Sequence, residues 1–135
     1  MIFVDTNILI DIVENDPIWA DWSQERLDGA AALGDVAINE VVYAELAVGY
    51  PSTGELDAMM ARVGIMLVPL PRDALFIAGK AYQRYRAAGG VRTGVLPDFF
   101  IGAQALAAEA QLITRDVRRY RTYFPHLPLI APMFN

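Results

Sequence analysis

Four short apolar runs divide the sequence, and each is followed by a stretch with helical spacing. The runs lie at residues 2–4, 36–38, 65–68 and 112–114 and are rich in β-branched residues. Short runs of this kind are typical of strands that are buried on both faces. Strands that alternate with helices pair in parallel, because each helix carries the chain back to the edge where the strand began. The pattern therefore predicts an α/β domain with a parallel sheet covered by helices on both faces.

Cap and stop residues bound the helices expected between these strands. Gly89 and Gly90 end one helix, and Pro97 stands where the next can begin. With 135 residues the chain has the length of one domain, and we expect residues 1–135 to form a single domain. The helices are expected at residues 7–13, 17–33, 40–48, 53–63, 73–88 and 97–110, followed by a basic turn or short helix at 115–121 and a last strand at 129–131.

Composition excludes several classes of chemistry. The sequence contains no cysteine and one histidine, His126, which rules out disulfides and thiolate catalysis and makes a histidine-based zinc site improbable. Its longest strongly apolar stretch, residues 63–68, is far shorter than the roughly 18 residues of a membrane span. The N-terminus lacks the basic residues of a signal peptide. We therefore expect a cytoplasmic protein that does not contact a membrane.

Charge is unevenly distributed along the chain. The net charge of −5 argues against a nucleic-acid partner, since phosphate binding depends on Lys and Arg. However, residues 1–60 hold 12 of the 16 acidic residues and sum to −11, whereas residues 61–135 hold 10 of the 11 basic residues and sum to +6. This asymmetry is compatible with compositional bias or solubility alone, and equally with a basic surface for phosphate.

Two aspartates follow predicted strands. Asp5 ends the first strand and Asp116 comes shortly after the fourth. The carboxyl edge of an open α/β sheet is where ligands bind. Each residue taken alone is equally well explained as a helix cap or turn aspartate.

Two further acids lie on apolar helix faces. Helical spacing places Glu45 on the face of Val42 and Val48, where an unpaired carboxylate would cost several kcal/mol or be protonated. Asp98 shares a face with Ile101 in the helix that follows Pro97. The alternatives are a Glu45 side chain that reaches water between helices and an Asp98 that interacts favourably with its helix dipole.

A parallel sheet can bring all four acids to one pocket at its carboxyl edge. Carboxylates within a few ångströms of one another repel, and their pKa values rise unless a cation is present. Hard oxygen ligands without Cys or His favour Mg²⁺ or Mn²⁺. The four acids together therefore predict a divalent-cation site.

Four segments of the chain resemble the motifs of the PIN-domain family, and within it the toxin ribonucleases of VapBC-type toxin–antitoxin pairs. The first is Ile-Phe-Val-Asp5-Thr-Asn7, and the second is Asn-Glu-Val-Val-Tyr-Ala-Glu45-Leu. The third is Leu-Pro-Asp98-Phe-Phe-Ile-Gly-Ala, and the fourth is Leu-Ile-Thr114-Arg-Asp116. The segments cover nearly the whole chain in the family's order, and none lacks its acid.

The resemblance implies a three-layer α/β/α sandwich with a short, mainly parallel sheet and a Mg²⁺- or Mn²⁺-dependent endoribonuclease activity. Asp5, Glu45, Asp98 and Asp116 would be the catalytic acids and metal ligands, holding a metal-activated water that cleaves RNA phosphodiester bonds. Asp5 and Asp98 would bind the metal directly, whereas Glu45 and Asp116 would bind through water or complete a second position.

The resemblance also implies supporting residues and partners. Asn7 and Thr114 would be polar support for the ligands or the attacking water. The chain would form a homodimer and act as the toxin of a toxin–antitoxin pair, inhibited by a cognate antitoxin protein that wraps around it and covers the site.

Arginines in the second half of the chain are candidates for RNA contacts. Arg115 neighbours Asp116, and Arg92 lies in a glycine-rich loop before Asp98. Arginine is well shaped to bind phosphate with two hydrogen bonds, so Arg92 and Arg115 are expected to bind RNA. The alternative is a solvated surface that balances an acidic partner.

Two other functions compete with the ribonuclease. A phosphoryl-transfer domain with an aspartate after its first strand would need a lysine late in the chain, but the single lysine is Lys80, in mid-helix. A non-catalytic PIN-like module acting on DNA through its antitoxin complex would not need four acids.

Overall fold

A fully parallel sheet forms the centre of the computed structural model, which describes residues 1–92 and 94–133. Within these residues the sheet has five strands in the order β3-β2-β1-β4-β5. The predicted α/β class and parallel pairing are therefore confirmed, and each predicted strand is found within one residue at either end. The strands are β1 (Ile2–Val4), β2 (Val36–Ile38), β3 (Ile65–Leu67), β4 (Gln111–Ile113) and β5 (Leu129–Ile130).

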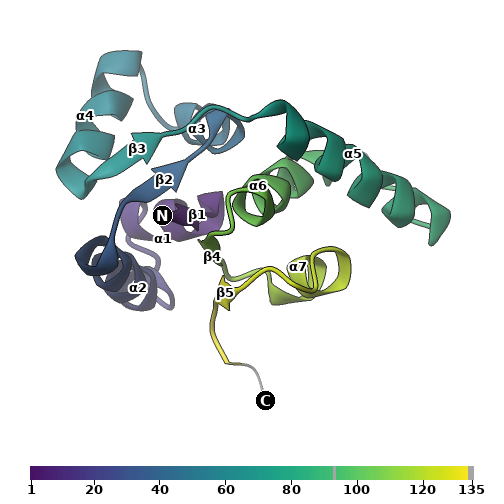
Figure 1. The fold of residues 1–135 in the computed structure, drawn as a ribbon. Helices are drawn as coiled ribbons and strands as arrows, with labels where there is room; N and C mark the ends of the chain where they lie inside the picture. The colour runs from purple at the N-terminus through teal and green to yellow at the C-terminus, as the bar shows by residue number, and fades with distance from the viewer. Residues whose placement is uncertain (93, 134–135) are drawn as a thin grey trace.

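Helices cover the sheet on both sides, as the apolar strands require. Figure 1 shows α1 and α2 on one side of the sheet and α5, α6 and α7 on the other, which gives the expected three-layer α/β/α sandwich. Strands β1 and β2 are buried along their whole length because both faces are covered. The helices are α1 (Thr6–Val13), α2 (Ala20–Leu33), α3 (Glu40–Ala47), α4 (Thr53–Val63), α5 (Arg72–Ala87), α6 (Leu96–Ala107) and α7 (Val117–Tyr123).

Helix α2 begins three residues later than the sequence predicts. The prediction placed Pro17 in its first turn, but the Asp16 carboxylate accepts hydrogen bonds from the backbone N–H groups of Ile18 (2.8 Å) and Trp19 (2.9 Å). These bonds hold the segment as a turn, and the regular helix starts at Ala20. Among the described residues, no helix combines the length and the apolar character that a membrane crossing requires.

The strand order reverses at the central strand β1, because β2 and β3 lie on one side of it and β4 and β5 on the other. Its neighbour on one side is β2, which follows it in sequence, and on the other side is β4, more than a hundred residues later. Ligands of open α/β sheets bind at such a switch point, beyond the carboxyl ends of the strands. The backbone N–H of Asp5 donates to the carbonyl of Ile113 (2.9 Å), so the end of β1 lies directly beside the end of β4.

Candidate active site

Asp5 is the most buried of the four predicted acids. It caps the N-terminus of α1, and 4% of its surface is exposed. Its Oδ1 accepts a hydrogen bond from the backbone N–H of Thr6 (2.8 Å). Its Oδ2 accepts hydrogen bonds from the Thr114 hydroxyl (2.7 Å), the Tyr120 hydroxyl (3.2 Å) and the Asn7 amide (3.3 Å). The two predicted supporting residues, Asn7 and Thr114, thus both contact this carboxylate.

Burial dominates the protonation of Asp5. It raises the pKa of the carboxyl from 3.8 to about 6, and the negative charge of Asp98 adds to this rise. The hydrogen bonds from Thr114, Thr6 and Tyr120 lower the pKa but do not offset burial. The pKa of the fully buried Tyr120 is raised well above its ordinary value by burial and by Asp5, so its hydroxyl stays a hydrogen-bond donor.

Glu45 does not occupy the buried position that helical spacing predicts. It is exposed, and Val48, predicted on the same buried face, is 91% exposed. Helix α3 is only eight residues long and buries just two of its residues, Val42 and Leu46, so its buried stripe does not extend to Glu45 and Val48. Its Oε1 accepts a hydrogen bond from the Thr6 hydroxyl (2.9 Å), which ties it to the residue directly after Asp5.

Asp98 lies in the first turn of α6, at the edge of the core. Its side chain is 25% exposed, whereas Ile101 on the same face is buried. Burial raises the pKa of the Asp98 carboxyl, and the charges of Glu45 and Asp116 raise it further, while the guanidinium of Arg119 lowers it. The charges of Glu45 and Asp116 therefore act on Asp98, which also forms an ion pair with Arg119.

Asp116 reaches the same place from the end of β4. Its backbone N–H donates to the Thr114 hydroxyl (3.0 Å), so Thr114 links Asp116 to Asp5. Its carboxylate lies 3.6 Å from Nη1 of Arg119, one helical turn further along α7. The same Nη1 donates to Asp98, which places Arg119 between the two carboxylates.

A close approach of two helices brings Asp98 and Asp116 together. Gly102 of α6 faces Phe124 and Tyr120, and a Cβ atom at this glycine would lie 2.9 Å from the Phe124 ring and 3.0 Å from the Tyr120 ring. Real Cβ atoms essentially never come as close as the distance to Phe124, and the distance to Tyr120 lies at the limit. Only a glycine therefore lets the rings pack against α6, which fixes α7 beside the start of that helix.

The four acids form one electrostatic cluster without a ready-made metal geometry. Among the described residues, no group of three or more His, Asp or Glu side chains is arranged to hold a metal ion as it stands. Arg119 supplies the cation between Asp98 and Asp116 instead. The donor set is made of carboxylate, hydroxyl and amide oxygens, which are the ligands that Mg²⁺ and Mn²⁺ prefer, so the residues fit such an ion.

Arg115 is engaged with a fifth acid that the sequence analysis did not select. Its Nε and Nη2 donate to the two carboxylate oxygens of Asp11 (2.7 and 2.8 Å), a buried residue that also accepts a hydrogen bond from Ser23 (2.8 Å). Its guanidinium lies 4.9 Å from the ring centre of Trp19. This pairing favours a structural role for Arg115, and the predicted RNA contact at this residue gains no support from it.

Arg92 is exposed beside the acidic cluster. It lines a surface hollow of about 560 Å³ together with Arg119, Val91, Gly94 and Val95. The hollow joins the glycine-rich segment before α6 to helix α7, which carries the cation of the cluster. A phosphate chain that crosses this hollow would meet two arginines next to the acids.

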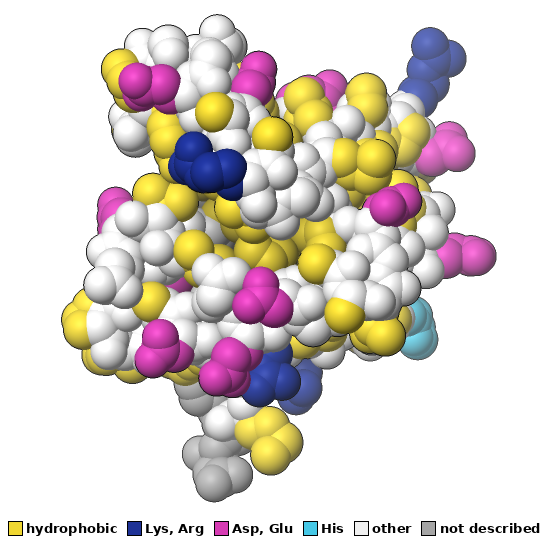
Figure 2. Space-filling model, turned by 90° about the vertical axis from the view of Figure 1, so that its left-hand side faces the viewer, with side chains coloured by type: hydrophobic (Ala, Val, Ile, Leu, Met, Phe, Trp, Pro, Cys, Tyr) yellow, Lys and Arg dark blue, Asp and Glu magenta, His cyan; other side chains and the backbone are white. Residues whose placement is uncertain are grey.

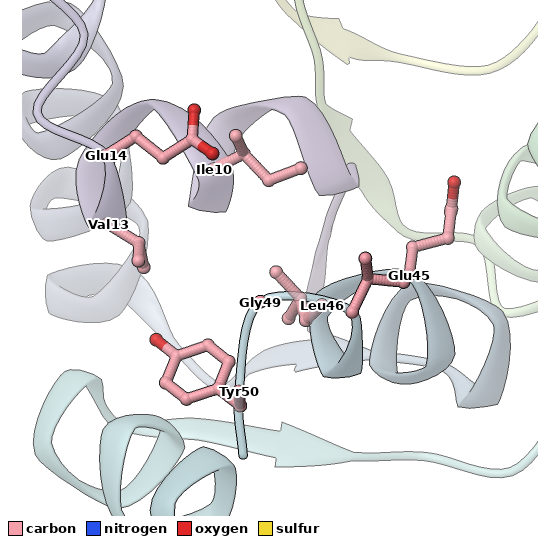
Figure 3. Close-up of a pocket in the computed structure, with 8 residues that line it drawn as sticks. Ile10, Val13, Glu14, Glu45, Leu46, Gly49 and Tyr50 are labelled. Carbon is pink, nitrogen blue, oxygen red and sulfur yellow. The ribbon is translucent and has the colours of Figure 1, made fainter.

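An apolar groove borders the cluster on its other side. It has a volume of about 220 Å³ and runs between α1 and α3. Glu45 lies at one end of the groove, and its carboxylate points away from Tyr50 (Figure 3). Figure 2 shows hydrophobic side chains gathered in a hollow on the side of the molecule that carries α2 and α4. The groove is lined by Ile10, Val13, Glu14, Glu45, Leu46, Val48, Gly49 and Tyr50.

Four residues contribute to the site or its support without having been selected from the sequence. Spacing was a usable signal for Arg119, which follows Asp116 by three residues on a helix, and for Tyr120, which follows it by four. Thr6 is adjacent to Asp5 in the first motif. Nothing in the sequence pairs Asp11 with an arginine 104 residues away.

Comparison with known proteins agrees with the fold. The sequence pattern described as the PIN domain matches residues 2–125. The chain belongs to the PIN-domain family. Residues 2–125 of this PIN domain contain all four acids, both supporting polar residues and both arginines named above.

Individual relatives of this PIN domain resemble it over their full length. It is 29% identical over 136 residues to ribonuclease VapC19 of Mycobacterium tuberculosis, a match that covers 99% of this chain and 100% of that protein. The structure of VapBC2 from Rickettsia felis bound to a promoter DNA fragment matches 97% of this chain and 98% of that one, with a TM-score of 0.74 and 21% identity. A toxin–antitoxin complex from Klebsiella pneumoniae matches all of both chains, with a TM-score of 0.70 and 22% identity.

Proposed function

We propose that this PIN domain is a Mg²⁺- or Mn²⁺-dependent endoribonuclease and the toxin of a toxin–antitoxin pair. The observation that carries the proposal is the meeting of Asp5, Glu45, Asp98 and Asp116, from four separate segments, at the switch point of the sheet. The full-length similarity to a protein named ribonuclease VapC19 supports the RNA substrate. The similarity of the fold to a toxin–antitoxin complex from Klebsiella pneumoniae supports the toxin role.

Each acid has a distinct place in the proposed site. Asp5 and Asp98 are the direct ligands, because they are the two whose pKa values burial raises and which therefore gain most from a nearby cation. Glu45 and Asp116 lie nearer solvent and complete the site directly or through water. A bound divalent ion would lower the pKa of a water molecule and neutralise the phosphate oxygens under attack.

The remaining polar side chains orient these acids. The Thr114 and Tyr120 hydroxyls and the Asn7 amide all donate to Oδ2 of Asp5, which leaves Oδ1 with the Thr6 backbone N–H as its only hydrogen-bond donor among the described residues. The Thr6 hydroxyl holds Glu45 in the same way. Ligands held by such hydrogen bonds keep their geometry when the cation and substrate arrive.

Charge and shape around the site suit the proposed partners. Arg92 and Arg119 border the acids on one side, where we place the RNA backbone, and Arg115 stays a weaker candidate because of its pair with Asp11. The groove between α1 and α3 is apolar and adjoins Glu45, and we propose that the cognate antitoxin covers it and thereby the site. A homodimer and a single domain over residues 1–135 stay predictions.

RNA cleavage by the purified chain, free of antitoxin, tests this proposal. Structured RNAs should be cleaved in Mg²⁺ or Mn²⁺ and remain intact in EDTA. Asp98→Asn should lower the cleavage rate by about 100-fold or more, because it removes a direct ligand. The matched control is Asp73→Asn, which alters an exposed aspartate in the first turn of α5, whereas Asp98 lies in the first turn of α6.

Two results of this experiment would contradict the ribonuclease. One is a wild-type chain that cleaves none of the RNAs in either metal, which would favour the non-catalytic module. The other is an Asp98→Asn variant that cleaves as fast as Asp73→Asn, which would place the activity elsewhere or in a contaminant.

A further inference from the structure

Arg119 is the one basic side chain that the described structure places on two of the proposed metal ligands. It projects from α7, its side chain is 23% exposed, and its Nη1 donates to Oδ2 of Asp98. The same nitrogen lies 3.6 Å from Oδ2 of Asp116. Arg119 therefore bridges an acid of α6 and the acid that precedes α7.

The position of Arg119 has a clear electrostatic cause. Asp98 is partly buried and surrounded by the negative charges of Glu45 and Asp116, all of which disfavour its ionised form. A guanidinium between two carboxylates offsets that repulsion and fixes both side chains in one arrangement. A divalent cation would be attracted to the same carboxylate oxygens for the same reason. The guanidinium and the divalent cation would therefore compete for one position.

We propose that Arg119 is a positioning residue that holds Asp98 and Asp116 in the ion-free protein and leaves them when a divalent cation binds. The proposal rests on the proposed function, since it takes the four acids as the cation site. It explains why the acids converge without a ready-made metal geometry among the described residues: the arrangement seen is the one that an internal cation maintains.

The released side chain has a defined place to go. Arg119 lines the surface hollow that it shares with Arg92. A guanidinium that turns from the carboxylates into this hollow stays at the mouth of the acidic pocket, where an RNA phosphate would lie. Arginine binds phosphate oxygens with two parallel hydrogen bonds, so Arg119 exchanges a carboxylate partner for the substrate backbone.

The first test is cation affinity, measured by calorimetric titration of the purified chain with Mn²⁺. Arg119→Gln keeps most of the aliphatic side chain but removes the competing charge, and we expect Mn²⁺ to bind it at least about fivefold more tightly than wild type. Arg121→Gln, in an exposed residue of the same helix, is the matched control for the loss of one positive charge. Equal Mn²⁺ affinities in Arg119→Gln and Arg121→Gln would contradict a competition between Arg119 and the cation.

The second test observes Arg119 itself, by NMR of the arginine guanidinium groups during a Mg²⁺ titration. The Arg119 signals, assigned by their absence in Arg119→Gln, should change from those of a restrained ion pair to those of a mobile guanidinium as the site fills. Arg115, paired with Asp11 outside the cation site, should keep its signals and serves as an internal control.

The outcomes separate this inference from the proposed function. If Mg²⁺ binds while the Arg119 signals stay those of an ion pair, Arg119 is not displaced and the inference is wrong, but the cation site stands. If no divalent cation binds to wild type or to Arg119→Gln, both the inference and the proposed function are wrong.

Discussion

Asp5 is held in the fold at a cost to stability. Burial raises the pKa of its carboxyl from 3.8 to about 6, so the folded protein binds this proton more tightly than the unfolded chain does. Protonation therefore favours folding: the stabilisation is complete below pH 3.8 and is lost as the pH rises through about 6. The shift corresponds to about 3 kcal/mol of stability lost by neutral pH in the absence of a cation.

This cost predicts how stability depends on pH. In EDTA, the ionisation of Asp5 should lower the free energy of unfolding by up to about 3 kcal/mol between pH 4 and pH 7.5. Asp5→Asn should flatten most of this fall, because the amide does not ionise. Urea unfolding at a series of pH values measures it, with Asp73→Asn, an exposed site, as the control that should keep the wild-type slope. A wild-type slope in Asp5→Asn would contradict the burial account.

For single residues, the sequence was informative where the place of a residue along the backbone determines its role. Asp5 and Thr114 end adjacent parallel strands, and their meeting follows from the strand order alone. Glu45 was misjudged because a helical wheel shows which residues share a face but not whether the face is covered; α3 buries only Val42 and Leu46. The pairing of Arg115 with Asp11 was not foreseen, because it is visible only in three dimensions, and the predicted RNA contact of Arg115 stays a prediction.

The Asp11–Arg115 ion pair joins three elements around the site. Asp11 lies on α1, receives a hydrogen bond from Ser23 on α2, and holds Arg115 in the loop between β4 and α7. The backbone N–H of Arg115 also donates to Oδ1 of Asn7 (3.3 Å). The pair therefore fixes the loop that carries Asp116 against the helix that begins at Asp5.

Removal of one partner should be strongly destabilising. Arg115→Ala would leave the Asp11 carboxylate, 3% exposed, without its bidentate partner, at a cost of about 3 kcal/mol. The measurement is urea unfolding, and Arg118→Ala, an exposed arginine on α7, is the control expected to change stability by less than about 0.5 kcal/mol. If the two variants were equally stable, the ion pair would not hold these elements together.

The elements themselves were largely predictable. The five strands, the helix end marked by Gly89 and the helix start marked by Pro97 follow from apolar runs and from local start and stop residues. The late start of α2 was not predicted, because Asp16 uses its carboxylate to hold a turn where the helix was expected to begin. The packing of α7 on Gly102 depends on two rings far along the chain and left no periodic signal.

Over the whole molecule, net charge is a poor guide to the partner. The net charge of −5 argues against an RNA substrate. However, four of the sixteen acids gather at one edge of the sheet, and Arg92 and Arg119 border them. A cation in that cluster converts a local negative charge into a place for phosphate. The fold makes this possible because parallel strands bring distant segments of the chain to the same edge.

The central claim is that this edge binds a divalent cation through acids from separate segments. Calorimetric titration of metal-free protein with Mn²⁺ tests it most directly, in wild type, Asp98→Asn and Asp73→Asn. We predict saturable binding in wild type and Asp73→Asn, and an affinity about 10- to 100-fold lower in Asp98→Asn. Binding of equal affinity in all three proteins, or no binding in any, would contradict the account.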